Sequence, residues 1–309
     1  MQQSNPNKRL AAFIMTYERA SSLGNYIDYM FAQRFPPDRI LIVDNSASSI
    51  TEEFVRGLAD PRVDYYRVGY NSGPAGAARI GLQKLAAAGY EWIYWGDDDD
   101  TPNFPDSIER LFEMIDSGIE NLGVVGEVSQ FFNRRIGEIV RIPDKALADQ
   151  EFVEAPSVAG GQCMLVSSKV VKAGILPDER LFFGLEELDF NLSVKAGGFS
   201  IKVHSGLMQR ARVMYGRVGF NRPAYERKSD MNREYYSVRN KLFILRKHRL
   251  YTAWLYQLIK ELLKLGYGYR YGIRYGTEQF KAISVAMFDS LTGRLGQRRD
   301  AMKAQSRLS

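Results

Sequence analysis

Four consecutive aspartates, residues 97–100, follow an apolar run in the segment EWIYWGDDDD. Carboxylates held this close repel one another, and ionising them together at a buried strand end is costly unless a cation is present. Hard divalent ions such as Mg²⁺ and Mn²⁺ prefer oxygen ligands and can bridge to phosphate groups. The run therefore predicts a divalent-metal site. The alternative is a solvated acidic turn that caps the helix after Pro102, where negative charge is favourable.

A second acidic cluster, Glu186-Glu187-Leu188-Asp189, lies in the segment ERLFFGLEELDF. Glu186 and Asp189 are three residues apart and would share one face of a helix, with Glu187 rotated away from them. One interpretation is an ordinary acidic helix start. The other is that one of the glutamates, partly buried among the neighbouring phenylalanines, acts as a general base.

Residues 71–81, NSGPAGAARIG, would enter a helix through small residues that allow a ligand to approach the backbone. A helix N-terminus favours anionic groups. The segment lacks the dinucleotide fingerprint and the P-loop lysine, which counts against NAD and Walker-type ATP binding. Arg79 could serve a diphosphate or a carboxylate, or be a surface arginine. Asp44, after the second predicted strand, could accept hydrogen bonds from a ribose or base.

Short apolar runs alternating with amphipathic segments must position these groups. The pattern predicts strands at 11–15, 40–43, 63–68, 92–95 and 122–125, and helices at 23–35, 51–58, 75–88 and 105–115. Strands that alternate with helices predict a mostly parallel α/β sheet, with ligands beyond the carboxyl ends of the strands. Residues 16–19, 44–46, 71–73 and 97–100 follow successive strands, so we expect their polar groups to converge at one edge.

The chain has 309 residues, 45% of them hydrophobic, and a single cysteine, Cys163. This composition excludes a disordered chain and an internal disulfide framework, and is compatible with a reducing compartment. No apolar run reaches the roughly 18–20 residues of a transmembrane helix, and the N-terminus does not resemble a secretory signal. Residues 1–206 carry 20 Lys+Arg and 29 Asp+Glu, a balance of −9, whereas residues 207–309 carry 22 and 7, a balance of +15. An acidic body is joined to a basic tail.

The ordered motifs TYER, VDNSA, NSGPAGAARIG, DDDD-TP, GGQCMLVSSKVVKAGILPDERLFF and LEELDFNLSVKAGGF closely resemble glycosyltransferase family 2. The resemblance covers roughly residues 9–206 and implies an inverting enzyme with the GT-A fold, a Rossmann-like α/β architecture. Residues 235–240 (YYSVRN) and 289–296 (DSLTGRLG) look like the subgroup that contains bacterial rhamnosyl- and galactofuranosyltransferases. We therefore expect a GT-A catalytic domain at 1–206 and a mainly helical, basic extension at 207–309.

The resemblance also implies roles for individual residues. Around a nucleotide-sugar donor it places Thr16, Tyr17, Arg19, Asp44, Asn71, Gly73, Arg79 and Asp98. It assigns Mn²⁺ or Mg²⁺ to Asp97 and Asp99, with a one-residue shift to 98–100 left open, and His204 is either a further ligand or a plain strand-end histidine. Glu187 is the candidate base, with Glu186 as the alternative. On the acceptor side are Gly160, Gly161, Gln162, Trp95 and Asp189.

These roles predict metal-dependent transfer of a sugar from UDP-galactofuranose, dTDP-rhamnose or a similar donor to a glycan or lipid-linked glycan, in bacterial cell-surface polysaccharide synthesis. The alternatives are a nucleotidyltransferase that makes sugar nucleotides and a non-enzymatic nucleic-acid-binding protein. The first should carry a phosphate-binding loop near the N-terminus, and the second leaves the acidic clusters unexplained. The basic tail fits an anionic membrane surface, which predicts a cytoplasmic protein peripheral at the inner face of the membrane. The alternative for the tail is a contact with its own body or a second protomer.

Overall fold

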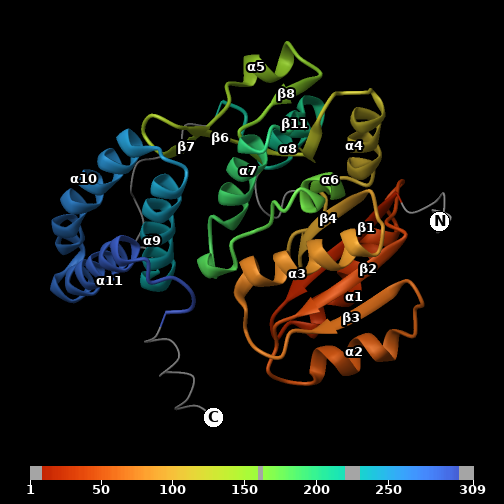
Figure 1. Cartoon of the computed structure of the whole chain (residues 1–309), viewed down its shortest axis with the longest axis horizontal. Helices are drawn as coiled ribbons and strands as arrows, with labels where there is room; N and C mark the ends of the chain where they lie inside the picture. Colours follow the sequence, from red (N-terminus) through yellow and green to blue (C-terminus); the bar gives the residue numbers. More distant parts are fainter. Residues whose placement is uncertain (1–8, 159–162, 220–229, 299–309) are drawn as a thin grey trace.

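The computed structural model describes residues 9–158, 163–219 and 230–298. Its centre is an eight-stranded sheet with the strand order β3-β2-β1-β4-β10-β5-β11-β8 (Figure 1). The strands are β1 Leu10–Thr16, β2 Arg39–Asp44, β3 Val63–Arg67, β4 Trp92–Asp97, β5 Leu122–Gly126, β8 Phe152–Glu154, β10 Met164–Ser167 and β11 Ser200–His204. A smaller sheet, in the order β7-β6-β9, is built from β6 Ser129–Asn133, β7 Glu138–Val140 and β9 Ser157–Val158.

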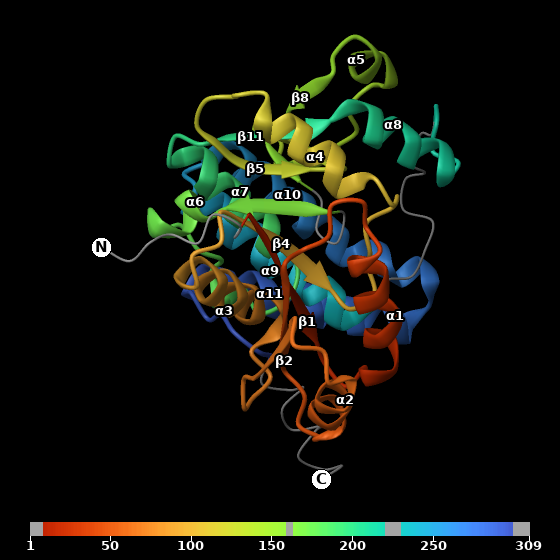
Figure 2. The same cartoon turned by 90° about the vertical axis from the view of Figure 1, so that its right-hand side faces the viewer.

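Helices cover both faces of the large sheet, and β1 shows why. Its residues are all buried, with Phe13 on one face and Ile14 on the other. The Phe13 face packs against α3 Gly73–Ala87, α6 Ser168–Lys172 and α7 Glu186–Ala196. The Ile14 face packs against α1 Ala20–Phe31, α2 Ile50–Leu58 and α4 Ser107–Asp116. Figure 2 shows α3 and α1 on opposite sides of β1. Burial on both faces explains the continuous apolar runs of the central strands.

The five strands and four helices predicted from the apolar pattern are all present, and β1 pairs in parallel with both β2 and β4. The mostly parallel α/β architecture is therefore confirmed. Two strands depart from the pattern: β10 lies antiparallel between β4 and β5, and the edge strand β8 pairs antiparallel with β11. The carboxyl ends of β1, β2 and β4 lie at the same edge, which brings the polar residues after these strands together.

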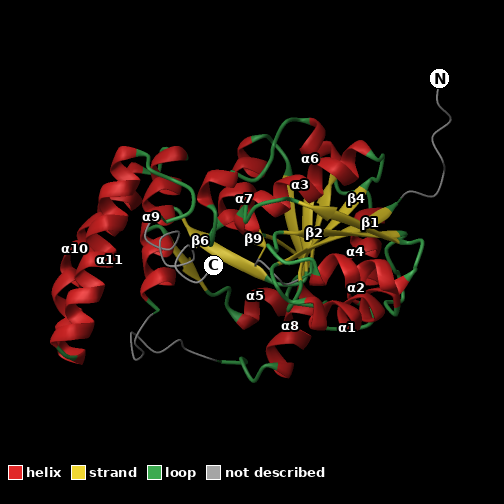
Figure 3. Cartoon of the chain, turned by 90° about the horizontal axis from the view of Figure 1, so that it is seen from below, coloured by secondary structure: helices red, strands yellow, loops and turns green. Residues whose placement is uncertain are grey.

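The C-terminal part is helical, as predicted. Its elements are α9 Met231–Lys247, α10 Tyr251–Tyr267, the 3₁₀ helix η2 Gly268–Tyr271 and α11 Ile273–Thr292. They form a compact group beside α7 and the small sheet, and Figure 3 shows α10 and α11 on its outer side. Buried residues of α9 and α11 form a core with Phe182 and Phe183, which precede α7. The tail thus packs on a loop of the body through its own hydrophobic core.

The expected division at residue 206 falls within α8 Ser205–Met214, which packs on α5 Asp144–Ala148. Arg212 of α8 is buried, and its guanidinium bonds to Asp144 and to the carbonyl oxygen of Ile142 at 2.8 Å. The 3₁₀ helix η1 Glu179–Leu181 completes the body. Within the described ranges, no helix combines the length and the apolar character needed to cross a membrane.

Candidate active site

The acidic cluster lies at the carboxyl end of β4. Asp97 ends the strand, and each of Asp97, Asp98 and Asp99 offers an oxygen atom within 4.8 Å of those of the other two. Asp98 is buried, whereas Asp99 is exposed. The backbone N–H of Asp100 donates to the carbonyl oxygen of Asp97 at 3.2 Å, which closes a tight turn. Of the two metal triplets left open by the sequence, the geometry favours the one that begins at Asp97.

The electrostatics of this cluster fit a cation. Burial, together with the carboxylates of Asp99 and Asp98, raises the pKa of Asp97 to about 7. Burial and Asp99 raise the pKa of Asp100 to about 6. Burial also raises the pKa of Asp98, against the hydrogen bonds from Thr16 and Arg19. A divalent ion would compensate both the buried negative charge and the repulsion that raise these pKa values, and carboxylate oxygens are its preferred ligands. The residues therefore fit the predicted metal.

Residues at the end of β1 hold the cluster from the other side. The Thr16 hydroxyl donates to Asp98 Oδ2 at 2.6 Å. Arg19 Nη1 donates to Asp98 Oδ1 at 3.0 Å and to Asp99 Oδ2 at 2.5 Å. Arg19 and Tyr17 remain exposed enough to meet a ligand, with 54% of the Arg19 side chain accessible. Three of the residues predicted at the donor side, Thr16, Arg19 and Asp98, are thus in direct contact.

Asp44, at the end of β2, is fully buried. Its Oδ1 accepts from the backbone N–H of Ser46 at 2.8 Å, and its Oδ2 accepts from the Tyr65 hydroxyl at 2.7 Å. Burial and the Asp44 carboxylate raise the pKa of Tyr65. In this structure Asp44 fixes the loop after β2.

Glu18 is a residue of this edge that the sequence interpretation missed, although it belongs to the TYER motif. Its Oε1 accepts from the backbone N–H groups of Ala47 at 2.8 Å and Ser48 at 3.1 Å. Its own N–H donates to the Ser46 hydroxyl at 2.7 Å. These bonds tie the loop after β1 to the loop after β2, which makes the edge a connected surface.

The N-terminus of α3 brings the donor side and the base side together. Asn71 Oδ1 accepts from the N–H of Gly73 at 3.0 Å. Gly73 has φ +69°, and a Cβ there would lie 2.2 Å from the carbonyl oxygen of Phe182. Only glycine allows this approach. The segment before α7 is therefore packed directly against the start of α3, where both Asn71 and Gly73 were predicted to contact the donor.

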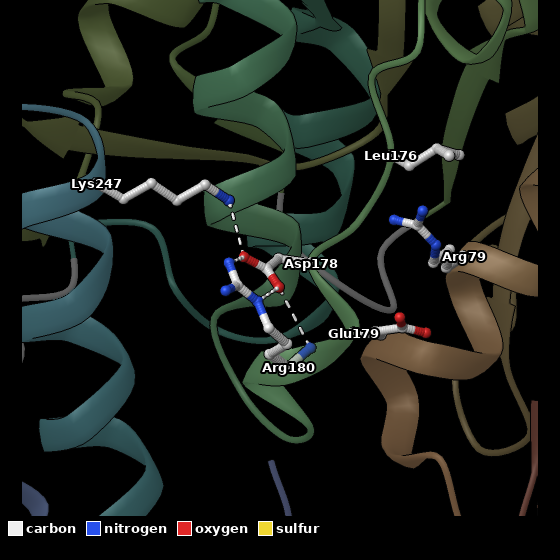
Figure 4. A pocket seen from close by; sticks show the side chains of 6 residues that line it. All are labelled: Arg79, Leu176, Asp178, Glu179, Arg180 and Lys247. Carbon is white, nitrogen blue, oxygen red and sulfur yellow. Dashed lines mark hydrogen bonds and ion pairs between the residues drawn. The ribbon is translucent and has the colours of Figure 1, made fainter. Parts of the chain in front are cut away.

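Arg79 lies elsewhere. It is six residues into α3, about 9 Å along the axis from Gly73 at 1.5 Å per residue. Its Nη1 donates to the carbonyl oxygen of Pro177 at 3.2 Å. Figure 4 shows it lining a pocket with Asp178, Arg180 and Lys247. The structure therefore separates Arg79 from the start of α3, and its predicted contact with a diphosphate there is not supported.

The two glutamates occupy the start of α7 and have different surroundings. Glu186 is buried, with no hydrogen-bond partner for its Oε2 among the described residues, and burial with the Glu187 charge raises its pKa well above normal. Glu187 is half-buried, and burial followed by the charge of Asp100 raises its pKa. The Glu187 charge in turn contributes to the raised pKa of Asp97. The charges of Glu187 and of the acidic cluster thus interact, and Glu187 is more accessible than Glu186, which favours it as the base.

Two predicted acceptor residues lie in the interior. Trp95 is 1% exposed, and its ring packs between Phe13 at 5.8 Å and Phe190 at 5.5 Å, because β4 is a central strand with both faces covered. Asp189 is completely buried, with Lys247 Nζ 2.6 Å from Oδ2 and His248 Nε2 2.9 Å from Oδ1. Its carboxylate is used to bind the tail to α7. Neither side chain can meet an acceptor here, so both assignments are corrected.

His204 is a helix cap. Its Nδ1 accepts from the backbone N–H of Leu207 at 3.3 Å, its ring packs edge-on against Phe152, and burial lowers its pKa. It ends β11, which is three strands from β4, or about 14 Å at the usual inter-strand spacing. Metal–ligand bonds are about 2 Å long, so His204 cannot share an ion with Asp97 in this arrangement. Of the two interpretations of His204, the structure therefore favours a plain strand-end histidine over a metal ligand. Gly160, Gly161 and Gln162 lie outside the described residues.

Known proteins share parts of this sequence. The chain is similar to galactofuranosyltransferase GlfT1 of Mycolicibacterium smegmatis (strain ATCC 700084 / mc(2)155), with 31% identity over 93 residues, 30% of each chain. It is also 31% identical to galactofuranosyltransferase GlfT1 of Mycobacterium tuberculosis (strain ATCC 25618 / H37Rv) over 90 residues, 28% of this chain and 29% of that one. The aligned part thus spans less than a third of these relatives.

Solved structures share the fold over most of the chain. The mannosyltransferase PcManGT from Pyrobaculum calidifontis, in complex with GDP-Man and Mn²⁺, has a TM-score of 0.54 at 13% identity, covering 93% of this chain and 88% of that one. TarS 1–349 of S. aureus, in complex with UDP-GlcNAc, has a TM-score of 0.55 at 12% identity, covering 91% and 81%. The profile of glycosyl transferase family 2 matches residues 11–172, just over half of the chain. The chain therefore belongs to glycosyl transferase family 2, the glycosyltransferase family expected from its sequence, and has the GT-A fold.

Proposed function

We propose that this protein is a metal-dependent inverting glycosyltransferase that moves a sugar from a nucleotide diphosphate donor to a hydroxyl group. One observation carries the proposal: three carboxylates cluster at the end of β4, and the charge of a half-buried glutamate, Glu187, contributes to the raised pKa of one of them, Asp97. A metal site and a base on one edge are the two groups that such a displacement needs.

The donor would bind at the edge formed by the ends of β1, β2 and β4. Asp97 and Asp99 would hold the divalent ion, and Asp98 would stay tied to Thr16 and Arg19. Mn²⁺ is favoured over Mg²⁺ by the PcManGT structure, which contains Mn²⁺. When bound, such an ion neutralises the diphosphate and makes it a better leaving group. Arg19 is a cation placed to assist, because it already contacts both Asp98 and Asp99.

Glu187 would take the proton from the acceptor hydroxyl. The hydroxyl oxygen then forms the new glycosidic bond at the anomeric carbon, while the bond from that carbon to the diphosphate oxygen breaks and its electron pair leaves with the diphosphate. A single displacement inverts the anomeric configuration and needs no nucleophilic side chain. Burial raises the pKa of Glu187, which makes it a stronger base than an ordinary carboxylate and suits this role.

The donor sugar is proposed from the curated relatives. Two of them are galactofuranosyltransferases at 31% identity, which makes UDP-galactofuranose the first donor to test and dTDP-rhamnose the second. Cell-surface polysaccharide synthesis, with a glycan or lipid-linked glycan as acceptor, follows from the same resemblance. We also propose that residues 1–206 supply the catalytic domain and that residues 207–309 supply the extension that locates it.

Helix α10 of the extension has polar side chains at buried positions and apolar side chains at exposed positions, which supports a membrane surface as the partner of the extension. The buried positions of α10 include Gln257 and Glu261, whereas its exposed positions include Leu255, Ile259 and Leu263, the last at 77%. Further tyrosines and apolar side chains of α10 and α11 are also exposed: Tyr251, Tyr256, Leu262, Tyr267, Ile273 and Phe280. Apolar side chains beside basic ones suit the interface of an anionic leaflet. A second copy is less favoured, because an isologous contact would bring two +15 tails together.

Vesicle sedimentation tests the membrane proposal. The protein should sediment with vesicles containing phosphatidylglycerol and remain in solution with phosphatidylcholine alone. Changing both Leu262 and Leu263 to serine should weaken that binding about tenfold or more, whereas Ile50→Ser, at another exposed apolar position on α2, should not. Unchanged binding of the double variant would overturn the proposal, as would a dimer in solution that the same substitutions dissociate.

The activity is tested by incubating the protein with nucleotide sugars and Mn²⁺ and measuring nucleotide release and glycan products. Transfer should need the divalent ion and should be lost on adding a chelator. An Asp99→Ala variant should lose most of the metal-dependent rate, and full retention would refute the metal assignment. Binding of UDP and Mn²⁺ with no transfer to any acceptor would leave a binding protein in place of an enzyme.

A further inference from the structure

The loop just before the two glutamates has an unusual backbone. Phe182 has φ +63° and Leu185 has φ +67°, with Gly184 at φ +81° between them. Non-glycine residues hold positive φ only where the surrounding structure enforces it. Leu185 is also the residue from which α7 begins. Any relaxation of this loop would therefore move the first turn of α7, which carries the proposed base.

Asn240, in the middle of α9, is the main contact that enforces this backbone. Its side-chain nitrogen donates to three carbonyl oxygens: those of Leu181 at 3.1 Å, Phe183 at 2.9 Å and Gly184 at 2.8 Å. The residue is completely buried. One side-chain amide of α9 thus binds carbonyl groups along the turn at residues 181–184, more than fifty residues earlier in the chain.

Arg239 fixes the direction of that amide. Its Nε donates to Asn240 Oδ1 at 3.0 Å, so the Asn240 nitrogen faces the loop. Its Nη2 donates to the carbonyl oxygen of Leu181 at 2.8 Å, and its Nη1 donates to that of Gly296 at 2.7 Å. Gly296 in turn donates to the carbonyl oxygen of Arg180 at 2.5 Å. The two tail motifs, residues 235–240 and 289–296, therefore meet on the same loop.

The charge of Arg239 makes a purely space-filling role a poor explanation. Arg239 is 1% exposed, and among the described residues no carboxylate forms an ion pair with it. A buried guanidinium is costly unless its donors are satisfied, and here the acceptors are two backbone carbonyl oxygens, of Leu181 and Gly296, together with Asn240 Oδ1 and the Tyr235 hydroxyl. Apolar residues would fill the same volume at lower cost. The arrangement instead fixes the path of residues 181–185.

We propose that Arg239 and Asn240 are positioning residues that hold the backbone before α7 so that Glu187 faces the acidic cluster. The inference rests on the proposed function, because it takes Glu187 as the base. The tail would then have two functions: it locates the enzyme, and its helix α9 holds the loop that orients Glu187. Neither residue touches substrate. Their loss should therefore lower kcat and leave donor binding nearly unchanged.

The first test is Asn240→Ala, with Arg246→Ala as the matched control. Arg246 lies on the same helix and also donates to two carbonyl oxygens, those of Ser290 and Leu291 at 3.0 Å, but it does not contact the loop. Release of UDP from UDP-galactofuranose with Mn²⁺ gives kcat and KM. We expect Asn240→Ala to lower kcat about 30- to 100-fold with KM within threefold, and the control to change kcat less than threefold. Mere loss of folded protein would appear in the control and in the thermal midpoint.

A second test uses the left-handed backbone itself. In the Asn240→Ala background, Leu185→Gly and Leu185→Ala remove nearly the same side chain, but only glycine adopts φ +67° at no cost. The glycine double variant should recover at least fivefold in kcat over the alanine one. Equal rates would contradict the inference that Asn240 acts by holding this backbone.

Glu187→Gln, measured in parallel, separates the two proposals. If it abolishes turnover while Asn240→Ala stays within threefold of the unmodified protein, the positioning role is overturned and the proposed function stands. If Glu187→Gln keeps full activity, the assignment of the base is wrong, and the positioning proposal falls with it. A loss of kcat in both variants with unchanged donor KM supports both.

Discussion

Replacing Asp97 with asparagine should stabilise the metal-free protein while destroying its response to metal. The carboxyl of Asp97 has its pKa raised from 3.8 to about 7, first by burial and then by the charges of Asp99 and Asp98. The folded protein therefore binds this proton more tightly than the unfolded chain does. The ionised Asp97 carboxylate therefore lowers the stability of the metal-free fold.

The sign and size follow from linkage. Because the folded pKa is the higher one, the free energy of unfolding falls as pH rises from about 4 to about 7 and stays low above that. A shift of about 3 units corresponds to roughly 4 kcal/mol at 1.36 kcal/mol per unit, an upper value that water and relaxation reduce. Asparagine has no charge to bury. Asp97→Asn should thus raise the free energy of unfolding at pH 8 by about 2–4 kcal/mol and change it little at pH 4.

Urea unfolding of metal-free protein at several pH values measures this directly. Asp116→Asn is the control, since Asp116 is an exposed partner of Arg9, and surface pairs contribute about 0–1 kcal/mol. Adding Mn²⁺ at a hundredfold excess over its Kd should stabilise the unmodified protein by about 2.7 kcal/mol and the Asp97 variant hardly at all. An Asp97→Asn protein that is less stable than the unmodified one at pH 8, or still stabilised by Mn²⁺, would refute the reasoning.

Three further predictions concern single side chains. Gly73→Ala should lower the free energy of unfolding in urea by about 1–3 kcal/mol, because its Cβ would overlap the carbonyl oxygen of Phe182. The control, Gly57→Ala in α2, has open space around its Cβ and should raise it by about 0.5–1 kcal/mol. Equal effects would contradict the close approach at Gly73. Glu187→Gln should lower kcat about 10²- to 10⁴-fold. Glu186→Gln should keep activity within tenfold, because Glu186 is buried and glutamine has nearly the same shape. The reverse order in steady-state kinetics would exchange the two roles. His204→Ala should lower the free energy of unfolding by about 1 kcal/mol, because a helix cap is lost, and should leave the affinity for Mn²⁺ unchanged. A lower affinity for Mn²⁺ in calorimetry would show that His204 is a metal ligand.

The parts of the fold that could be predicted are those in which local pattern and burial agree. The strands β1, β2, β4 and β5 are apolar runs, because both faces of a central strand are covered, whereas β3 is a partly buried edge strand. β10 could not be placed, since three apolar residues after residue 163 carry no signal for an antiparallel strand between β4 and β5. The two-to-five-residue strands of the small sheet are too short to show a period.

The site shows the same division. The aspartates after β4 and the glutamates of α7 could be found because their chemistry is local to one motif. The errors are residues whose surroundings come from distant segments: Trp95 is enclosed by β1 and α7, and Asp189 by Lys247 and His248 almost sixty residues later. A contact of the tail with its own body was one of the options for the tail, but the sequence did not indicate that the buried Asn240 would make this contact with a loop of the body. The periodicity of a sequence predicts which face of a helix is apolar, but it does not predict which segment of the chain packs against that face.

The most direct test of the central claim is the anomeric configuration of the product formed with Mn²⁺. The protein would be incubated with UDP-galactofuranose or dTDP-rhamnose and a glycan acceptor, and the new linkage read by NMR from its first turnover products. The proposed roles of the acidic cluster and Glu187 predict a linkage inverted relative to the donor, formed only with the divalent ion and lost in Glu187→Gln. A product that retains the donor configuration, or transfer at full rate in the presence of a chelator, would contradict the mechanism.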